Sequence, residues 1–180
     1  MRKRWLALVL VTLTALAGCG AKDDGDALAN TVAAQNGSVH ISVPEGWAED
    51  TSYELHDTLV LVVGNGADTW AQVNYYPDDG NGYSAKDFLD MASENHFGNY
   101  IVDKAAELKL GDNAAAYFGY SMAGKDADGN DCTYRGYEYF VSFGANVAEV
   151  DIFCRYTDTA PTSEQQELMR SIAESIQPGA

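Results

Sequence analysis

The chain has 180 residues, with 11 basic and 27 acidic side chains, and its formal net charge at pH 7 is −16. Such an acidic chain repels phosphate backbones and anionic lipid headgroups, which excludes nucleic acid as an expected partner. The acidic residues are scattered along the sequence, so most of them are expected to form a solvated surface.

The N-terminal 18 residues have the pattern of an export signal. Residues 2–4 are all basic, and residues 5–16 are apolar apart from two threonines. This apolar stretch is shorter than the about 20 residues that a membrane-spanning helix needs. A charged start, a short apolar core and a small-residue end are typical of a secretory signal. We therefore predict that residues 1–18 are removed on export.

The end of this segment reads Leu16, Ala17, Gly18, Cys19, which resembles the lipobox of bacterial lipoproteins. In that family the cysteine sulfur receives a diacylglycerol, and the peptide is cut directly before the cysteine. The resemblance implies that a lipid on Cys19 anchors the mature chain to the outer face of the bacterial cell membrane, with its domain extracytoplasmic. The alternative is an ordinary cleaved signal followed by an incidental cysteine.

Removal of residues 1–18 leaves 8 basic and 27 acidic side chains, a formal charge of −19. Residues 20–37 are small, polar and acidic, without apolar periodicity. Such a segment buries too little surface to offset its ordering entropy, so residues 19–37, which begin with the lipidated cysteine, are predicted to be a flexible acidic tether. Residues 38–177 then form one domain, of a size that supports a hydrophobic core.

The first half of this domain is predicted to contain three strands. Alternating apolar residues predict a strand over residues 39–43, which Pro44 ends. Residues 59–63 and 70–76 are two further strands, and the turn-forming residues 64–68 between them predict a hairpin.

Two helices are expected. Ser84 can cap the first, and Asp87 is favoured near its positive end. The last helix is predicted to start near Thr162 or the next residue, with Gln165 available for a capping box. The apolar residues that form its expected buried stripe are Leu168, Met169, Ile172, Ala173 and Ile176.

Four more strands are predicted between the two helices, over residues 106–110, 114–122, 132–143 and 147–156. The links between consecutive strands are short, which favours antiparallel pairing because parallel neighbours need long crossovers. Two apolar helix stripes need a sheet to cover. We therefore predict an α+β domain: a layered sandwich in which helices pack on an antiparallel sheet of about six or seven strands.

Three segments of this pattern resemble PsbP-like domains: VHISVPEGW at residues 39–47, YRGYEYFVSFGANVAEVDIFC at 134–154, and IAESI at 172–176. That fold is shared by a photosystem II extrinsic subunit and a Ran-binding nuclear transport protein, and it occurs in bacterial lipoproteins. The resemblance covers residues 38–177. It implies a three-layer sandwich that works by binding or assembly rather than by catalysis, and it assigns no functional residue.

One loop has the composition of a cation site, with the oxygen-bearing residues Asp126, Asp128, Asn130 and Asp131. Their spacing begins like an EF-hand loop and would suit calcium. The pattern then departs, because Asp131 stands where that loop needs glycine and Tyr137 where it needs a bidentate glutamate. The favoured interpretation is an ordinary hairpin loop, for which Asp-Gly is a strong indication.

Cys132 and Cys154 remain once Cys19 is lipidated, and an even count in an exported domain favours a disulfide between them. The expected hairpin register opposes this bond. A tight turn at residues 144–145 would place Cys154 opposite Arg135, on the other face of the sheet from Cys132. A bulge, for example at Gly136, would be needed to bring the sulfur atoms together. We nevertheless predict the bond.

Tyrosines are dense on the late strands, at Tyr117, Tyr120, Tyr134, Tyr137, Tyr139 and Tyr156. An aromatic sheet face can recognise a partner or a small ligand. It is also what a strand covered by a helix looks like, and this structural interpretation is favoured because tyrosine has a high strand propensity.

No catalytic signature accompanies these features. The sequence has no nucleophile elbow and no phosphate-binding loop, and none of its three histidines has a second ligand at metal spacing. We therefore predict a membrane-anchored, non-enzymatic binding or assembly module for another envelope component, with no cofactor besides the lipid on Cys19. The alternative is a lipoprotein that binds or senses a small ligand or a cation. An envelope hydrolase has the least support.

Overall fold

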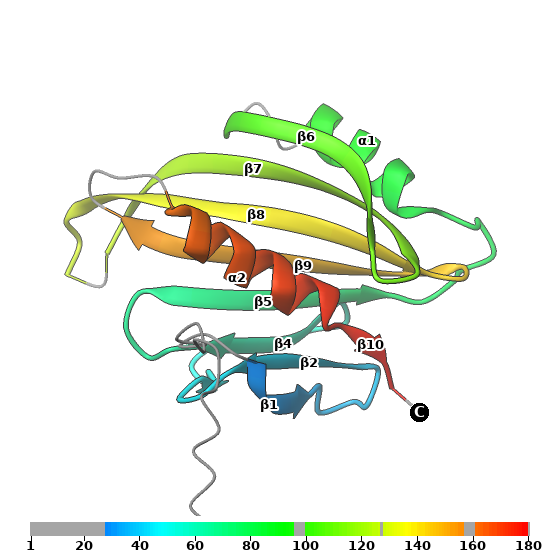
Figure 1. The fold of residues 1–180 in the computed structure, drawn as a ribbon, viewed down its shortest axis with the longest axis horizontal. Helices are drawn as coiled ribbons and strands as arrows, with labels where there is room; N and C mark the ends of the chain where they lie inside the picture. Colours follow the sequence, from blue (N-terminus) through cyan, green and yellow to red (C-terminus); the bar gives the residue numbers. More distant parts are fainter. Residues whose placement is uncertain (1–27, 96–99, 127, 157–160, 180) are drawn as a thin grey trace, which may run out of the picture.

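The computed structural model describes residues 28–95, 100–126, 128–156 and 161–179. Its centre is a seven-stranded antiparallel sheet in the order β3-β4-β5-β9-β8-β7-β6 (Figure 1). The strands are β3 (Ala48–Glu49), β4 (Leu59–Gly64), β5 (Thr69–Tyr76), β6 (Ile101–Leu110), β7 (Asn113–Lys125), β8 (Asp131–Phe143) and β9 (Asn146–Tyr156). The α+β prediction with a sheet of about six or seven strands is confirmed.

A second sheet and two helices complete the fold. The small sheet has the order β1-β2-β10, with β1 (Leu28–Ala33), β2 (Val39–Pro44) and β10 (Gln177–Pro178). The helices are α1 (Ala85–Asn95) and α2 (Ser163–Glu174). In Figure 1 the helix α2 runs across the seven-stranded sheet, with the small sheet beyond β4, while α1 contacts β7 and β8.

The two helices pack on opposite faces of the large sheet. On one face, Ala85 and Ala92 of α1 contact Phe118 and Phe140 of the central strands. On the other face, α2 and β2 share a larger core with the alternate residues of β4, β5, β8 and β9. The fully buried members of this larger core include Ile41, Leu61, Ile152, Met169 and Ile172. The result is a layered sandwich, as the sequence predicted.

Both helices begin where the sequence predicts. The Ser84 hydroxyl donates to the carboxylate of Asp87, which also accepts from the Ser84 backbone N–H. Before α2, the Thr162 hydroxyl accepts from the Gln165 backbone N–H, and the Gln165 side chain accepts from the Thr162 backbone N–H. These reciprocal bonds satisfy backbone N–H groups that a helix start otherwise leaves without partners.

The late hairpins have tight turns that keep the register regular. Leu110 pairs with Asn113, and Phe143 pairs with Asn146. In the second hairpin the turn requires a left-handed backbone, which Gly144 supplies with φ +64°. The predicted opposition of Arg135 and Cys154 follows from this register and is confirmed.

The predicted tether is wrong over residues 28–33, which form strand β1. This strand pairs antiparallel with β2, and its residues Leu28 and Val32 pack partly buried against the larger core. Its other side chains are mostly exposed, so the composition of an edge strand is nearly that of a linker. The domain therefore includes at least ten residues before the predicted boundary at residue 38.

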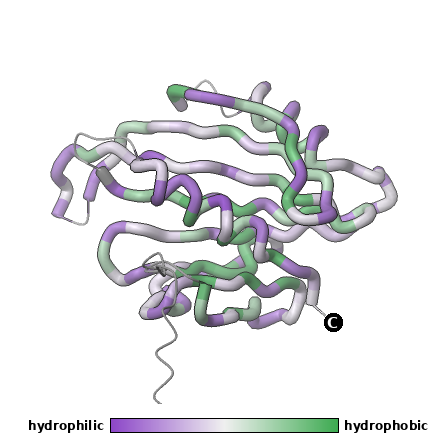
Figure 2. The backbone as a smooth tube through the Cα atoms, viewed as in Figure 1, coloured by the Kyte–Doolittle hydropathy of each residue, from purple (hydrophilic) through white to green (hydrophobic). Residues whose placement is uncertain are grey.

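Hydropathy along the backbone follows the layers. Figure 2 shows hydrophobic residues along β2 and β4, and many hydrophilic residues along the edge strand β6. β4 has five successive buried residues because both of its faces are covered, whereas most of β6 is exposed. Within the described ranges, no helix is long and apolar enough to cross a membrane.

Candidate functional site

Three carboxylates gather on the face of the large sheet that α1 covers. Glu138 of β8 pairs directly with Asp151 of β9, and Glu149 lies two residues before Asp151 on the same face. All three line a recess of 380 Å³ between the sheet and α1. The other residues that line this recess are Gln72, Tyr76, Phe88, Met91, Ala92, Asn95, Tyr100 and Phe140.

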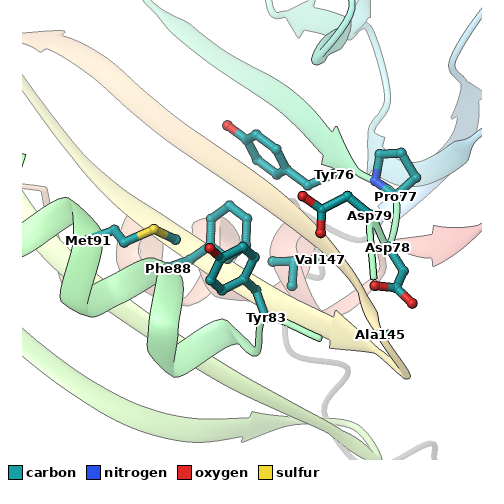
Figure 3. Close-up of a pocket in the computed structure, with 9 residues that line it drawn as sticks. All are labelled: Tyr76, Pro77, Asp78, Asp79, Tyr83, Phe88, Met91, Ala145 and Val147. Atoms are coloured by element: carbon teal, nitrogen blue, oxygen red, sulfur yellow. The ribbon is translucent and has the colours of Figure 1, made fainter. Parts of the chain in front are cut away.

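The acidic recess adjoins a more apolar one, of 200 Å³, and the two share Tyr76, Phe88 and Met91. Figure 3 shows the apolar end, where Phe88 and Met91 project from α1 towards Tyr76 and Tyr83. The centroid of the Phe88 ring lies 4.7 Å from the centroid of the Tyr76 ring and 6.2 Å from that of the Tyr83 ring. We call the two recesses together the α1 groove; it has an aromatic end and an acidic floor.

Hydrogen bonds hold two of the three carboxylates. The Tyr120 hydroxyl donates to Asp151 at 2.8 Å, and the Tyr76 hydroxyl donates to Glu149 at 2.9 Å. Glu149 also accepts from the Asn74 amide at 3.0 Å. Within the described part of the chain, no hydrogen-bond donor reaches the carboxyl group of Glu138. This carboxyl group is thus the group on the groove floor that a ligand could satisfy.

Burial and mutual repulsion make these groups difficult to ionise. Burial, together with the negative charges of Asp151 and Glu149, raises the pKa of Glu138 to about 10. Burial also raises the pKa of Asp151 to about 7, an effect that the hydrogen bond from Tyr120 opposes and the charge of Glu149 reinforces. Because the two carboxyl groups are neighbours, they hold at least one proton between them at neutral pH.

The acidic floor of the α1 groove can bind a polar or cationic group. A protonated carboxyl group on Glu138 can donate a hydrogen bond to an acceptor. The same group can release its proton when a cation arrives, because a positive charge favours the ionised form. Perturbed carboxyl groups in a cleft of this kind are typical of functional sites.

Sequence reasoning found only part of this site. In the sequence, Glu149 and Asp151 lie on the polar face of the last strand, and Phe153 on the same face predicts that this face is partly covered. The covering element is α1. Glu138 was missed. It lies on the same face of β8 as Gly136 and Phe140, which are both buried, and this pattern could have indicated that Glu138 is covered as well.

The tyrosines divide between the two sheet faces. Tyr120 and Tyr134 lie on the α1 side, and Tyr120 is buried there. Tyr117, Tyr137 and Tyr139 lie on the α2 side and line a second cleft, of 540 Å³, between β6, β7, β8 and α2. We call this second cleft the tyrosine cleft. The side chain of Tyr156 is outside the described part of the structure.

The predicted cation loop is a hairpin connection between β7 and β8, which pair at Lys125 and Asp131. One carboxylate oxygen of Asp126 accepts from the backbone N–H groups of Asp128 and Asn130, so this side chain closes the loop. Among the described residues, which omit residue 127, no group of three or more acidic, histidine or cysteine side chains could hold a metal ion. The connection between β7 and β8 is the hairpin that the favoured interpretation expects.

The predicted disulfide between Cys132 and Cys154 does not form. Cys132 pairs with Gly124 near the start of β8, whereas Cys154 is buried opposite Arg135, and its sulfur lies 3.3 Å from the Thr69 hydroxyl. The bulge that the bond needs is absent because Gly136 pairs regularly with Phe153. The alternation of side chains along β8 therefore keeps the two thiols on opposite faces of the sheet.

We expect alkylation of the unreduced native chain to distinguish the two thiols. Cys132 is partly exposed and should react with iodoacetamide, while Cys154 should react only after unfolding. Peptide mass spectrometry before and after denaturation measures both. A cross-linked peptide that contains both cysteines would contradict the structure.

The lipobox residues Leu16, Ala17 and Gly18, and the predicted lipidation site Cys19, lie outside the described residues. The prediction for this segment therefore continues to depend on the sequence.

No protein-family model matches the sequence, and no curated protein matches it. The structure is similar to cyanobacterial PsbP (CyanoP) from Synechocystis sp. PCC 6803, with a TM-score of 0.54 and 13% identity over 91% of this chain and 98% of that one. It is also similar to a point mutant of the protein Mog1, with a TM-score of 0.52 and 10% identity over 82% of this chain and 94% of that one. The domain has the PsbP-like fold.

A crystal structure from Bacteroides thetaiotaomicron VPI-5482 is similar to the PsbP-like domain as well. Its TM-score is 0.57, with 12% identity over 85% of this chain and 49% of that one, so the present chain spans about half of its length. The fold that the sequence resemblance implied is therefore confirmed. At these identities the similarity concerns the fold alone.

Proposed function

We propose that this chain is a lipid-anchored, extracytoplasmic, non-enzymatic binding module. In this proposal a lipid on Cys19 holds the PsbP-like domain at the outer face of a bacterial membrane, and the domain assembles with another envelope component. The observation that carries the proposal is the α1 groove, where the carboxyl group of Glu138 lacks a hydrogen-bond partner among the described residues while it lines an open recess.

The charges of the groove indicate what kind of group it receives. When they are ionised, Glu138, Glu149 and Asp151 repel one another, and burial strengthens that repulsion. A lysine or arginine side chain of a partner protein would replace this repulsion with attraction and would supply the donors that Glu138 lacks. The adjoining aromatic residues Tyr83 and Phe88 would cover the aliphatic part of that side chain.

Site-specific photo-crosslinking in native membranes tests this proposal. Met91 lies at the rim of the groove with 36% of its surface exposed, whereas Glu94 is exposed on the same helix and does not line the groove. A benzoylphenylalanine at residue 91 should give a discrete adduct with another protein, and the same probe at residue 94 should give none.

A second substitution connects that adduct to the acidic floor. Glu138→Gln keeps the shape of the side chain but cannot become negative, so it should reduce the yield of the residue 91 adduct several-fold. Equal adducts from both probe positions, or an adduct that Glu138→Gln leaves unchanged, would contradict a partner in the groove.

A second candidate function, the binding of a small ligand, is favoured by the tyrosine cleft. This cleft is larger than either recess of the α1 groove and lies on the opposite face of the large sheet.

A further inference from the structure

The tyrosine cleft has the size of a ligand site. Its volume of 540 Å³ falls within the about 300–1,000 Å³ that is usual for small-molecule pockets. One wall is the edge strand β6, the floor is β7 and β8, and the other wall is α2. None of the residues that line it takes part in the α1 groove.

The floor of the cleft is a continuous aromatic platform. The centroid of the Tyr117 ring lies 5.6 Å from that of the Tyr139 ring, with an interplanar angle of 17°. It lies 6.2 Å from the centroid of the Tyr137 ring. Tyr139 is buried, with 4% of its surface exposed, while Tyr117 and Tyr137 are only partly buried and line the cleft. Two tyrosine rings are therefore available to a ligand, and a third supports them.

A glycine makes room for this platform. Gly119 of β7 pairs with Tyr137 of β8, and a Cβ atom at residue 119 would lie only 2.9 Å from the Tyr137 ring. Because Gly119 has no side chain, the Tyr137 ring lies over the β7 backbone beside Tyr117. The platform thus depends on the local sequence as well as on the strand register.

The walls of the cleft carry balanced charges. Asp103 and Lys104 lie on the β6 side, and Glu167 and Arg170 lie on α2. Burial raises the pKa of Tyr137, the charge of Asp103 raises it further, and that of Lys104 lowers it. Their formal charges cancel, whereas the whole chain carries a net charge of −16. An anionic ligand would meet two carboxylates here, and a cationic ligand would meet two basic groups. One of these basic groups, Lys104, lies 5.7 Å from the centre of the Tyr117 ring.

The polar groups of the walls suit a ligand with many hydroxyl groups. Carboxylate and guanidinium groups are planar and can each bond two neighbouring oxygen atoms. The side chains of Gln166 and Ser163 add groups that both donate and accept. A pyranose ring presents hydroxyls at its rim and C–H groups on its faces, and such faces pack well on the negative face of a tyrosine ring.

We propose that the tyrosine cleft is a binding site for a neutral oligosaccharide, which stacks on Tyr117 and Tyr137 and whose hydroxyl groups bond to the charged side chains of β6 and α2. This inference goes beyond the proposed partner in the α1 groove and does not depend on it, because the two sites share no residue.

Calorimetric titration of the detergent-solubilised full chain tests the inference. The probes are linear oligosaccharides of glucose, mannose, galactose and N-acetylglucosamine, together with an oligomer of galacturonic acid as the charged comparison. We expect saturable binding of at least one neutral oligosaccharide and weaker binding of the acidic one. No binding of any neutral oligosaccharide at millimolar concentration, or preferred binding of the acidic oligomer, would overturn the proposal.

Variants locate the site. Tyr137→Ala should raise the dissociation constant at least tenfold. Arg170→Ala should raise the dissociation constant several-fold. Arg170 is exposed on α2 and the fold does not need it, so this variant tests the site even if Tyr137→Ala fails to fold. Lys86→Ala removes an exposed cation from α1 on the other side of the sheet and should leave binding unchanged. Binding that the variants at residues 137 and 170 leave unchanged would place the sugar elsewhere and overturn the proposal.

Discussion

The full chain with Cys19→Ser is expected to disappear from the membrane fraction and to appear in the soluble extracytoplasmic fraction. Serine has no sulfur to receive the diacylglycerol. Each methylene group of a buried acyl chain contributes about 0.8 kcal/mol to membrane binding, so the loss of the lipid lowers the affinity by many orders of magnitude. The acidic domain offers no electrostatic substitute, because it is repelled by anionic headgroups.

Fractionation after a high-salt wash, with mass spectrometry of the N-terminal peptide, measures this effect. Ala17→Gly serves as the matched control, because it keeps the residues before the cysteine small and leaves the thiol in place; it should remain with the membranes. A Cys19→Ser chain that still sediments with salt-washed membranes would contradict the lipoprotein prediction.

The stability of the folded domain is expected to fall as the pH rises from about 5 to about 9, and Glu138→Gln should remove much of this dependence. The pKa values of Glu138 and Asp151 are raised in the folded state, to about 10 and about 7, so the folded protein holds protons that the unfolded chain has released. The free energy of unfolding therefore declines with pH from the ordinary carboxyl pKa upwards.

Glu138→Gln removes one of these ionisations. One unit of pKa shift corresponds to about 1.4 kcal/mol, so the variant should be more stable than the wild type by roughly 1–3 kcal/mol at pH 8, with a smaller difference at pH 5. Thermal unfolding monitored by circular dichroism at the two pH values measures this. Glu94→Gln, at an exposed position on α1, removes the same charge and is the control. Equal pH dependence in the wild type and the Glu138→Gln variant would contradict the assignment.

The effects of Glu138→Gln on stability and on crosslinking are to be interpreted together. A substitution that stabilises the domain while it weakens the adduct at Met91 would indicate that the carboxyl group is kept for binding at a cost in stability. A purely structural residue at this position would lower stability when it is replaced.

Local patterns were sufficient for much of the fold. The capping residues Ser84 and Thr162 set the helix starts, and the glycine-containing turns set the register of the late hairpins. Strand β1 could not be predicted in this way, because its polar sequence becomes a strand only through pairing with β2. That pairing is a tertiary contact, and no periodicity within residues 28–33 predicts it.

The candidate site was harder to predict for a related reason. Whether Glu138 and Asp151 face water or a helix depends on where α1 packs, which the strand sequence does not encode. The cysteines illustrate the opposite case. The register argument already placed Cys132 and Cys154 on opposite faces, and the general frequency of disulfides in exported domains was the weaker guide.

Strand β1 would also limit how far a lipid-anchored domain could stand from a membrane. Leu28 follows Cys19 by nine residues, so with a lipid on that cysteine the strand begins within roughly 30 Å of its anchor, even with the chain fully extended. A tether that continued to residue 37 would have allowed about twice this reach. A lipid on Cys19 would thereby confine the domain to a thin layer above the bilayer, which would raise its effective concentration towards partners in the same layer and keep it from surfaces further away.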